Sequence, residues 1–226
     1  MSPLRRTRPE VRRTARLEAS IVYLLLAAAP GLAMAHSYEP PGQEGDAVEA
    51  ARAAVEETVR KGIAILQDDS LSPQVKRDRV IALAEERFDF DLIARLVLAR
   101  SWRRFDPEQR AEFTREFKQH LAATYGDRLR DYSEETVEFG PAHLEANGDV
   151  TGETRVVGGA AGEGISVQYR MRNRRGEWKV IDVIIEGISM VSNFRSQVRD
   201  LMAGSTPDEL IQKLHRKNVE RSASRT

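Results

Sequence analysis

The sequence predicts a single α+β domain, in which helices pack around an antiparallel sheet. Two observations lead to this fold class. Apolar residues recur with the helical period of about 3.6 up to Tyr132, and from Thr136 to Ile185 the period changes to about 2, as in strands. Helical spacing then returns at Met190. Consecutive strands flanked by helices on both sides are typical of the α+β class.

Composition and charge exclude several classes of protein. The 226 residues include 35 basic and 35 acidic side chains, a balance that argues against nucleic acid as a partner. Cysteine is absent, which rules out disulfides, thiol nucleophiles and cysteine-ligated metals. The four histidines lack metal-binding spacing, so we predict neither a metal site nor a cofactor.

The first 35 residues have the parts of a cleavable secretory signal. Six arginines lie within residues 1–20, an apolar run follows over residues 21–35, and an Ala-x-Ala motif ends at Ala35. The alternative is a transmembrane anchor, but Pro30 and Gly31 interrupt the run before the roughly 20 apolar residues that a span requires. We therefore expect cleavage after Ala35 and export of the remaining chain.

The exported chain divides into three predicted segments, namely a flexible lead-in (36–45), one domain (46–218) and a polar C-terminal tail (219–226). Three helices begin with a capping residue followed by proline, at Ser72, Asp106 and Thr206. We expect helices over residues 46–67, from 73, 90–102, 107–132, 190–203 and from 207. We expect strands over residues 136–139, 150–157, 165–171 and 178–185.

The last predicted strand, residues 178–185, is apolar on both faces except at Asp182. Such a strand is central in its sheet or is wrapped by helices. Asp182 itself has two interpretations, a hydrogen-bonded structural aspartate or a catalytic base. No serine lies in a Gly-x-Ser-x-Gly motif, and we predict no catalytic residue.

Two loops of the strand region carry unusual compositions. The glycine-rich segment 158–164 joins two strands and precedes no helix, so we expect a mobile hairpin loop and not a phosphate-binding loop. Arg172, Arg174 and Arg175 cluster at the tip of the next hairpin. A solvated surface is the simpler interpretation, and contact with an acidic partner or an anionic head group is the alternative.

Apolar faces dominate the rest of the chain. Phe113, Phe117, Leu121 and Tyr125 recur every four residues and form an aromatic-rich stripe on one helix. Such a stripe packs into a core or, in part, lines a ligand cavity. Trp102 and Trp178 are predicted to be core aromatics. Because catalytic motifs are scarce and apolar faces are extensive, the sequence favours binding of an apolar ligand over catalysis.

The run Trp178–Met190, WKVIDVIIEGISM, resembles a sequence motif of the MlaC/Ttg2D (toluene-tolerance) family. Upstream, Arg87–Phe90, Trp102 and the aromatic stripe follow the order and spacing of that family, and the similarity spans about residues 48–217. One departure is Ala99, where family members often have glycine. It affects a helix end, and we expect no effect on function.

The resemblance implies a non-enzymatic periplasmic carrier. Its ligand would be a glycerophospholipid, and its partners an outer-membrane lipoprotein/porin complex and an inner-membrane ABC transporter. A hopanoid-type lipid is the alternative ligand. The implied fold is an NTF2-like antiparallel sheet wrapped by helices that enclose an apolar cavity, with the acyl chains between sheet and helices.

Eight residues are predicted to contact this lipid. They are apolar or aromatic and lie on the aromatic helix, on the last two long strands or just after them: Phe117, Leu121, Tyr125, Val167, Tyr169, Val183, Ile185 and Ile188. Ile188 follows Gly187, which permits a sharp turn, and its alternative role is to plug a packed core. Two other functions remain open, an NTF2-like isomerase or dehydratase using Asp182 and a structural adaptor with a filled core.

Overall fold

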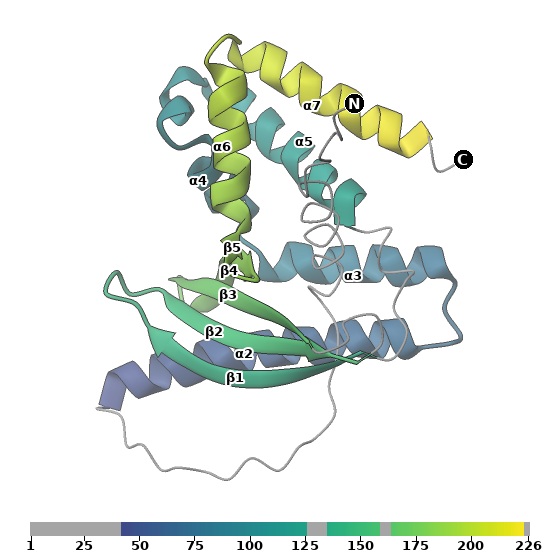
Figure 1. The fold of residues 1–226 in the computed structure, drawn as a ribbon, viewed down its shortest axis with the longest axis vertical. Helices are drawn as coiled ribbons and strands as arrows, with labels where there is room; N and C mark the ends of the chain where they lie inside the picture. The colour runs from purple at the N-terminus through teal and green to yellow at the C-terminus, as the bar shows by residue number, and fades with distance from the viewer. Residues whose placement is uncertain (1–41, 126–134, 159–163, 224–226) are drawn as a thin grey trace, which may run out of the picture.

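A computed structural model describes residues 42–125, 135–158 and 164–223 of the chain. It contains helices and a five-stranded antiparallel sheet, which confirms the predicted α+β class (Figure 1). The predicted signal sequence lies outside the described residues, as do most of the lead-in, the centre of the glycine-rich loop and the last residues of the tail.

The helices begin where the sequence places capping residues. Asp106 and Gln109 exchange hydrogen bonds between side chain and backbone, at 2.8 and 3.1 Å, and Thr206 and Glu209 do the same at 3.3 and 2.8 Å. Ser72 Oγ accepts the Val75 N–H at 3.4 Å. The helices are α2 (Gly42–Gln67), α3 (Pro73–Arg87), α4 (Phe90–Leu98), the 3-10 helix η2 (Ala99–Arg104), α5 (Pro107–Tyr125), α6 (Met190–Met202) and α7 (Pro207–Ala223).

The strands form a meander, in which each strand pairs with the next in sequence. In order across the sheet they are β1 (Thr136–Leu144), β2 (Val150–Val157), β3 (Ile165–Arg174), β4 (Glu177–Ile185) and the short β5 (Ile188–Ser189). Residues 175–176 and 186–187 connect β3 to β4 and β4 to β5. All four connecting residues have positive φ, as two-residue hairpin turns of type I′ require.

Several element boundaries differ from those expected. Helix α2 begins at Gly42, inside the predicted lead-in, and α7 continues to Ala223, inside the predicted tail. Strand β1 continues beyond Gly140 and Pro141, where the sequence suggested a break. The register of β1 against β2 shifts between Phe139 and Ala142, and β1 is an edge strand. A bulge on an edge strand tolerates proline because its missing N–H is not needed there.

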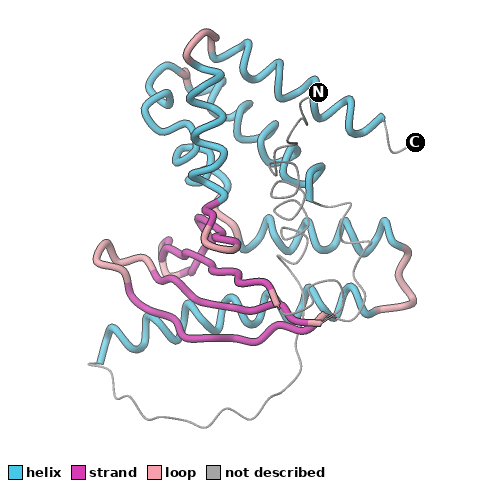
Figure 2. Tube along the Cα trace, in the orientation of Figure 1, coloured by secondary structure: helices cyan, strands magenta, loops and turns pink. Residues whose placement is uncertain are grey.

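The elements form two layers (Figures 1 and 2). The sheet, α2 and α3 make up one, which we call the sheet layer, and α4, η2, α5, α6 and α7 make up the other, the helical layer. Helix α2 packs on strands β1, β2 and β4, whereas α5 packs on α4 and α7. Helix α6 follows β5 directly and joins the two layers.

The chain turns sharply between α4 and η2. Ala99 there has φ 48° and ψ −118°, and its side chain is exposed. This combination of angles is common for glycine and strained for residues with a Cβ atom. The departure from glycine noted in the sequence therefore falls on a position whose backbone conformation favours glycine.

Candidate functional site

The structure brings four of the eight predicted site residues together on one face of the sheet. Val167 pairs with Ile185 across β3 and β4, and Tyr169 pairs with Val183. Directly paired residues point to the same face, so the four side chains form a continuous patch. All four are buried. We call this surface, with its neighbours on β1 and β2, the apolar sheet face.

Strands β1 and β2 extend this face with further apolar residues. Val156 pairs with Val137 and Ile165, and Thr154 pairs with Phe139 and Val167. The opposite face of β2 and β3 carries mainly charged and polar side chains, such as Arg155 and Gln168. The alternation therefore separates an apolar from a polar face, as expected for a sheet covered on one side.

Two hydroxyl groups lie within the apolar sheet face. Burial raises the pKa of the Tyr169 phenol, and a hydrogen bond with Thr154 opposes this effect. Thr154 Oγ1 in turn donates to the Val167 carbonyl at 2.8 Å. Each of these two hydroxyls has a hydrogen-bond partner within the protein, so neither is left unsatisfied where the face contacts a hydrocarbon chain.

Ile188 lies at the margin of the apolar sheet face. It pairs with Ile185 across the β4–β5 turn and therefore points to the same side of the sheet. Its relative exposure is 42%, so it does not plug a packed core as the alternative role required. Whether it contacts a ligand stays a prediction, and its position is where the apolar face meets solvent.

Phe117 and Leu121 lie in the helical layer, apart from the four sheet residues. The Phe117 ring stacks on Phe113 with a centroid distance of 5.6 Å and meets Phe194 edge-on at 5.1 Å. Leu121 is buried. Tyr125 ends α5, and its side chain lies outside the described part of the chain. Contact of these residues with lipid also stays a prediction.

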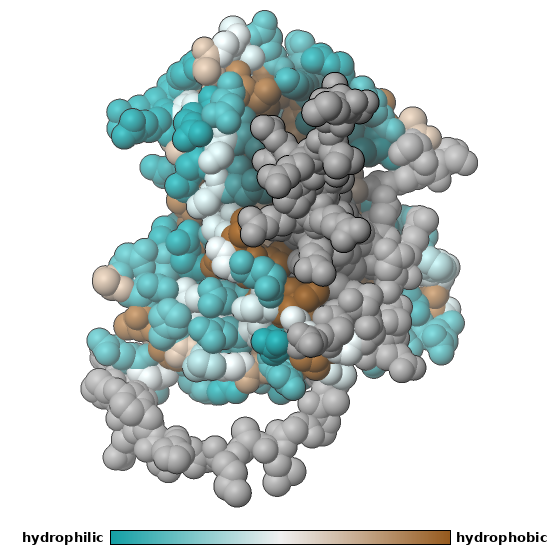
Figure 3. All heavy atoms as spheres, viewed as in Figure 1, coloured by the Kyte–Doolittle hydropathy of each residue, from teal (hydrophilic) through white to brown (hydrophobic). Residues whose placement is uncertain are grey.

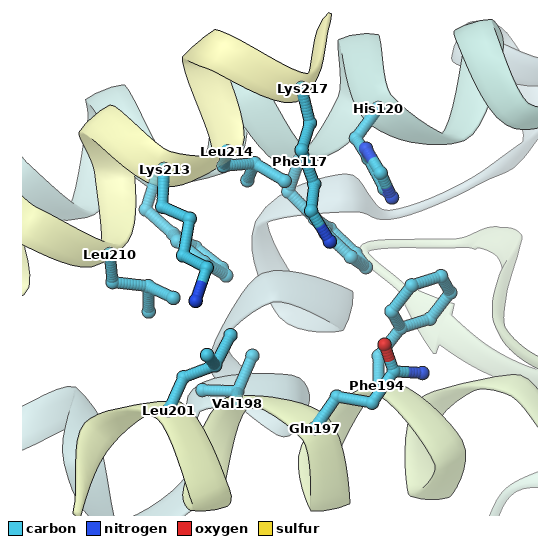
Figure 4. Close-up of a pocket in the computed structure, with 11 residues that line it drawn as sticks. Phe117, His120, Phe194, Gln197, Val198, Leu201, Leu210, Lys213, Leu214 and Lys217 are labelled. Atoms are coloured by element: carbon cyan, nitrogen blue, oxygen red, sulfur yellow. The ribbon is translucent and has the colours of Figure 1, made fainter. Parts of the chain in front are cut away.

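A small cavity lies beside Phe117, between α5, α6 and α7 (Figure 4). Its volume is about 50 Å³. Phe194, Val198 and Leu214 supply apolar walls, and Lys217 extends across it from α7. An apolar cavity that holds benzene measures roughly 150 Å³, so this space is too small for an acyl chain.

Polar groups are buried next to this cavity, where α7 packs on α5. Asn218 Nδ2 donates to the carbonyl and to the carboxylate of Glu116, both at 2.9 Å, and Asn218 Oδ1 lies 3.2 Å from His120 Nδ1. His215 Nδ1 lies 3.1 Å from the same carboxylate. These residues join two helices about a hundred positions apart in sequence and form what we call the α5–α7 polar cluster.

The cluster shifts the acidity of two of its members. Burial lowers the pKa of His120, and the positive charges of Arg221 and Lys217 lower it further, against a hydrogen bond with Asn218. For Glu116, burial opposes ionisation, but hydrogen bonds from Asn218, His215 and Arg115 outweigh it and lower the pKa. The arrangement therefore favours a neutral histidine beside an ionised carboxylate.

Asp182 has a structural role in the described geometry. It is 2% exposed, and its two oxygens accept hydrogen bonds from the Ser189 hydroxyl at 2.6 Å and from the Val191 N–H at 3.0 Å. Both donors belong to the start of α6, and Arg170 lies 3.6 Å away. The carboxylate thus fastens α6 to the polar face of β4, which favours the structural interpretation over a catalytic base.

Within residues 42–125, 135–158 and 164–223, acidic and histidine side chains are nowhere grouped in a way that could hold a metal ion. No helix in these ranges combines the length and the apolar character needed to span a membrane.

Comparison with known proteins identifies the family. A family model described as "MlaC protein" matches residues 56–216. Toluene tolerance protein ttg2D of Pseudomonas putida is 34% identical over 115 residues, which are 50% of this chain and 53% of that protein. The chain thus spans about half the length of this curated relative.

A solved structure has a similar fold. It is a phospholipid-binding protein from Ralstonia solanacearum in complex with a phospholipid, and it superposes with a TM-score of 0.68 at 25% identity. The match covers 76% of this chain and 98% of that one. Because the family model also covers well over half of the sequence, the chain belongs to the MlaC family.

Proposed function

We propose that this protein binds a glycerophospholipid by its acyl chains and carries it across the periplasm, between an outer-membrane complex and an inner-membrane ABC transporter. The observation that carries this proposal is the apolar sheet face, a patch of paired residues that runs from the interior to the exposed Ile188. The similarity to a protein solved with a bound phospholipid supports the choice of ligand.

A carrier is needed because the lipid does not leave a membrane unaided. Two acyl chains hold on the order of 30 methylene groups, and each costs about 0.8 kcal/mol to expose to water, roughly 24 kcal/mol in total. A binding site has to replace this contact with apolar surface. The apolar sheet face supports this proposal, since Val167, Val183 and Ile185 supply aliphatic surface and the hydroxyls beside them are hydrogen-bonded within the protein.

The entry route proposed for the lipid lies beside Ile188, where the apolar sheet face meets solvent. Figure 3 shows apolar surface gathered in the middle of this side of the molecule, between the helical layer and the sheet layer. The head group would remain in water at the margin of the sheet, and the chains would extend along Val183, Ile185 and Val167. Binding then replaces contacts of these side chains with acyl contacts.

The experiment that tests the proposal is Ile188→Glu. A carboxylate at this position would have to be desolvated against the acyl chains, so we expect lipid binding to be lost. The fold should survive because the side chain is exposed. Native mass spectrometry of the purified protein measures bound lipid, and circular dichroism melting measures stability.

Val219→Glu is the matched control. Val219 is also an exposed apolar residue, at 53%, but it lies on α7 in the helical layer. This variant should keep its lipid. Equal lipid content in both variants would contradict the proposed site, and a protein purified without any lipid would contradict the proposed ligand. Mass spectra with a sterol-like mass in place of a phospholipid would identify a hopanoid-type ligand.

A further inference from the structure

A groove rich in arginine opens where the helical layer meets the hairpin of β3 and β4. It encloses about 870 Å³ and is separate from the apolar sheet face. Six arginines line it, although they come from four elements: Arg95 of α4, Arg100 and Arg103 of η2, Arg172 and Arg174 of β3, and Arg195 of α6. We call it the arginine groove.

Two of these arginines, both on β3, are paired with aspartates that do not line the groove. Arg172 binds Asp149 through two hydrogen bonds of 2.6 and 2.8 Å, and Arg174 Nε lies 3.0 Å from Asp89. Both acids are themselves held within the fold, and neither lines the groove. The lower rim is therefore fixed in position and nearly neutral.

The upper rim carries uncompensated positive charge. Arg195 Nε donates to the Leu96 carbonyl at 2.9 Å, which orients the guanidinium without neutralising it. Arg95, Arg100 and Arg103 are exposed, and within the described ranges their side chains form no ion pair. Residues 36–226 contain 29 basic and 33 acidic side chains, so this charge is a local feature of a mildly acidic chain.

The floor between the arginines is apolar. Leu92, Leu96 and Trp102 line it. Trp102 is partly buried: it packs against the hydrophobic core, as predicted, and also lines the groove. The Arg110 guanidinium lies 4.8 Å from the indole centroid and hydrogen-bonds to the Trp102 carbonyl at 3.1–3.2 Å, which holds this residue in place.

The groove also lies on the other side of the sheet from the proposed lipid. Along β3, Arg172 and Arg174 alternate with Tyr169 and Met171, so they belong to the polar face. The six arginines are thus too far around the molecule to be part of the apolar sheet face. The groove is therefore not part of the proposed lipid site.

We propose that the arginine groove docks an acidic segment of a protein partner, whose carboxylates pair with Arg95, Arg100 and Arg103 while an apolar side chain rests on Trp102 and Leu96. Guanidinium groups pair with carboxylates through two parallel hydrogen bonds. Tryptophan and arginine are also the residues that most often dominate binding energy at protein interfaces. The concave shape fits a protruding segment better than it fits a flat bilayer.

This docking surface rests on the proposed function, since a carrier has to dock at each end of its route. It specifies where on the carrier docking takes place, that the docking surface is basic, and that the partner offers an acidic protein segment. Local positive potential also steers an acidic partner during encounter, even though the chain as a whole is mildly acidic.

The test compares two double variants with the same change of charge. Arg100→Glu/Arg103→Glu reverses the upper rim, and Arg79→Glu/Arg216→Glu reverses two exposed arginines on α3 and α7, outside the groove. The probe is a short fluorescein-labelled peptide of glutamate and leucine residues, measured by anisotropy. We expect the groove variant to weaken the peptide Kd by about tenfold or more and the control variant to leave it nearly unchanged.

Arg95→Glu, on a different helix, should weaken the peptide Kd as well, and salt between about 50 and 300 mM should weaken it in the unmodified protein. Equal affinity in all variants would overturn the proposal. So would co-sedimentation with equimolar phosphatidylglycerol–phosphatidylcholine vesicles without peptide binding, because the surface would then serve a membrane. Native mass spectrometry separates the two proposals: a groove variant that binds peptide poorly but keeps its lipid leaves the lipid site intact.

Discussion

The apolar sheet face and the α5–α7 polar cluster are both buried, but they are held together differently. On the sheet face, aliphatic side chains such as Val167 and Val183 supply the contacts, and the hydroxyls of Thr154 and Tyr169 remain neutral. Between α5 and α7, Glu116, His120 and Asn218 exchange directed hydrogen bonds. The aliphatic contacts of the apolar sheet face depend little on direction, whereas each hydrogen bond of the α5–α7 polar cluster requires a defined donor–acceptor geometry.

This difference indicates which region can accept a ligand. Aliphatic contacts can be exchanged for acyl contacts at little cost, because hydrocarbon packs against hydrocarbon in either case. A buried polar cluster loses its partners when the helices separate, and each unsatisfied group then costs about 1–3 kcal/mol. We therefore expect α5 and α7 to keep their packing, while side chains of the apolar sheet face replace protein contacts with acyl contacts.

The largest effect on stability should come from Asp182→Ala, which removes the hydrogen bonds between β4 and the start of α6. The substitution leaves the Ser189 hydroxyl and the Val191 N–H without an acceptor at the start of α6. We expect a loss of about 2–4 kcal/mol of stability, or roughly 5–15 °C in melting temperature for a chain of this size. Thermal melting followed by circular dichroism measures it.

Hydrogen exchange locates this loss. Amides of α6 should lose protection in the alanine variant before amides of β3 do, if the two layers are separate cooperative units. Asp182→Asn keeps one acceptor oxygen and should lose less stability. Uniform loss of protection over both layers would show that they unfold as one unit and would remove the distinction between them.

A smaller effect of opposite sign is expected for Ala99→Gly in the helical layer. Ala99 has φ 48° and ψ −118°, a conformation that costs a residue with a Cβ atom about 1–3 kcal/mol. Glycine removes the strain but loses more entropy on folding, by roughly 0.5–1 kcal/mol. We expect a net gain of about 1 kcal/mol in stability, measured by denaturant unfolding.

Ala203→Gly serves as the control, since Ala203 has ordinary helical angles, with φ −64° and ψ −29°. It should not stabilise the protein, because glycine there relieves no strain. Destabilisation by Ala99→Gly would mean that the turn between α4 and η2 is not strained by its alanine.

The smallest effect is the response to pH, because it depends on single protons. The pKa of His120 is lowered by burial, so as pH falls through about 6.5 the unfolded chain takes up a proton before the folded one. Stability therefore decreases toward acid. Glu116 acts in the same direction at lower pH. Its pKa is lowered in the folded protein, so the carboxylate stabilises the fold at pH values above its ordinary pKa, and this stabilisation is lost on acidification.

Alkaline pH should destabilise the protein through Tyr169 of the apolar sheet face. The pKa of Tyr169 is raised, so above about pH 10 the unfolded chain releases the phenol proton first and folding becomes less favourable. Melting temperatures recorded across pH measure both branches. His120→Gln should flatten the acid branch near about pH 6.5 and leave both the Glu116 contribution at lower pH and the alkaline branch, whereas Tyr169→Phe should flatten only the alkaline branch. A decrease in stability near about pH 6.5 that persists in His120→Gln would assign it to other groups.

Most helices and strands of this protein could be predicted because their sequence signals are local. Ser72, Asp106 and Thr206 find their hydrogen-bond partners three residues along the chain, so the helix starts could be predicted. Strand periodicity predicted β2, β3 and β4, and it grouped Val167 with Tyr169 and Val183 with Ile185 on shared faces. These are properties of neighbouring residues, which sterics and hydrogen bonding decide within a few positions.

Which faces of these elements pack together could not be predicted, because it depends on residues far apart in the chain. The sequence predicted that the stripe on α5 packs into a core or, in part, lines a ligand cavity, but not that Phe117 packs against Phe194 of α6. The arginine hairpin was visible in the sequence, but its convergence with Arg95, Arg100 and Arg195 was not. The hydrogen bonds between Asn218 and Glu116 join residues 102 positions apart. Contacts at such separations depend on how whole layers pack, and no local pattern of residue types encodes that packing.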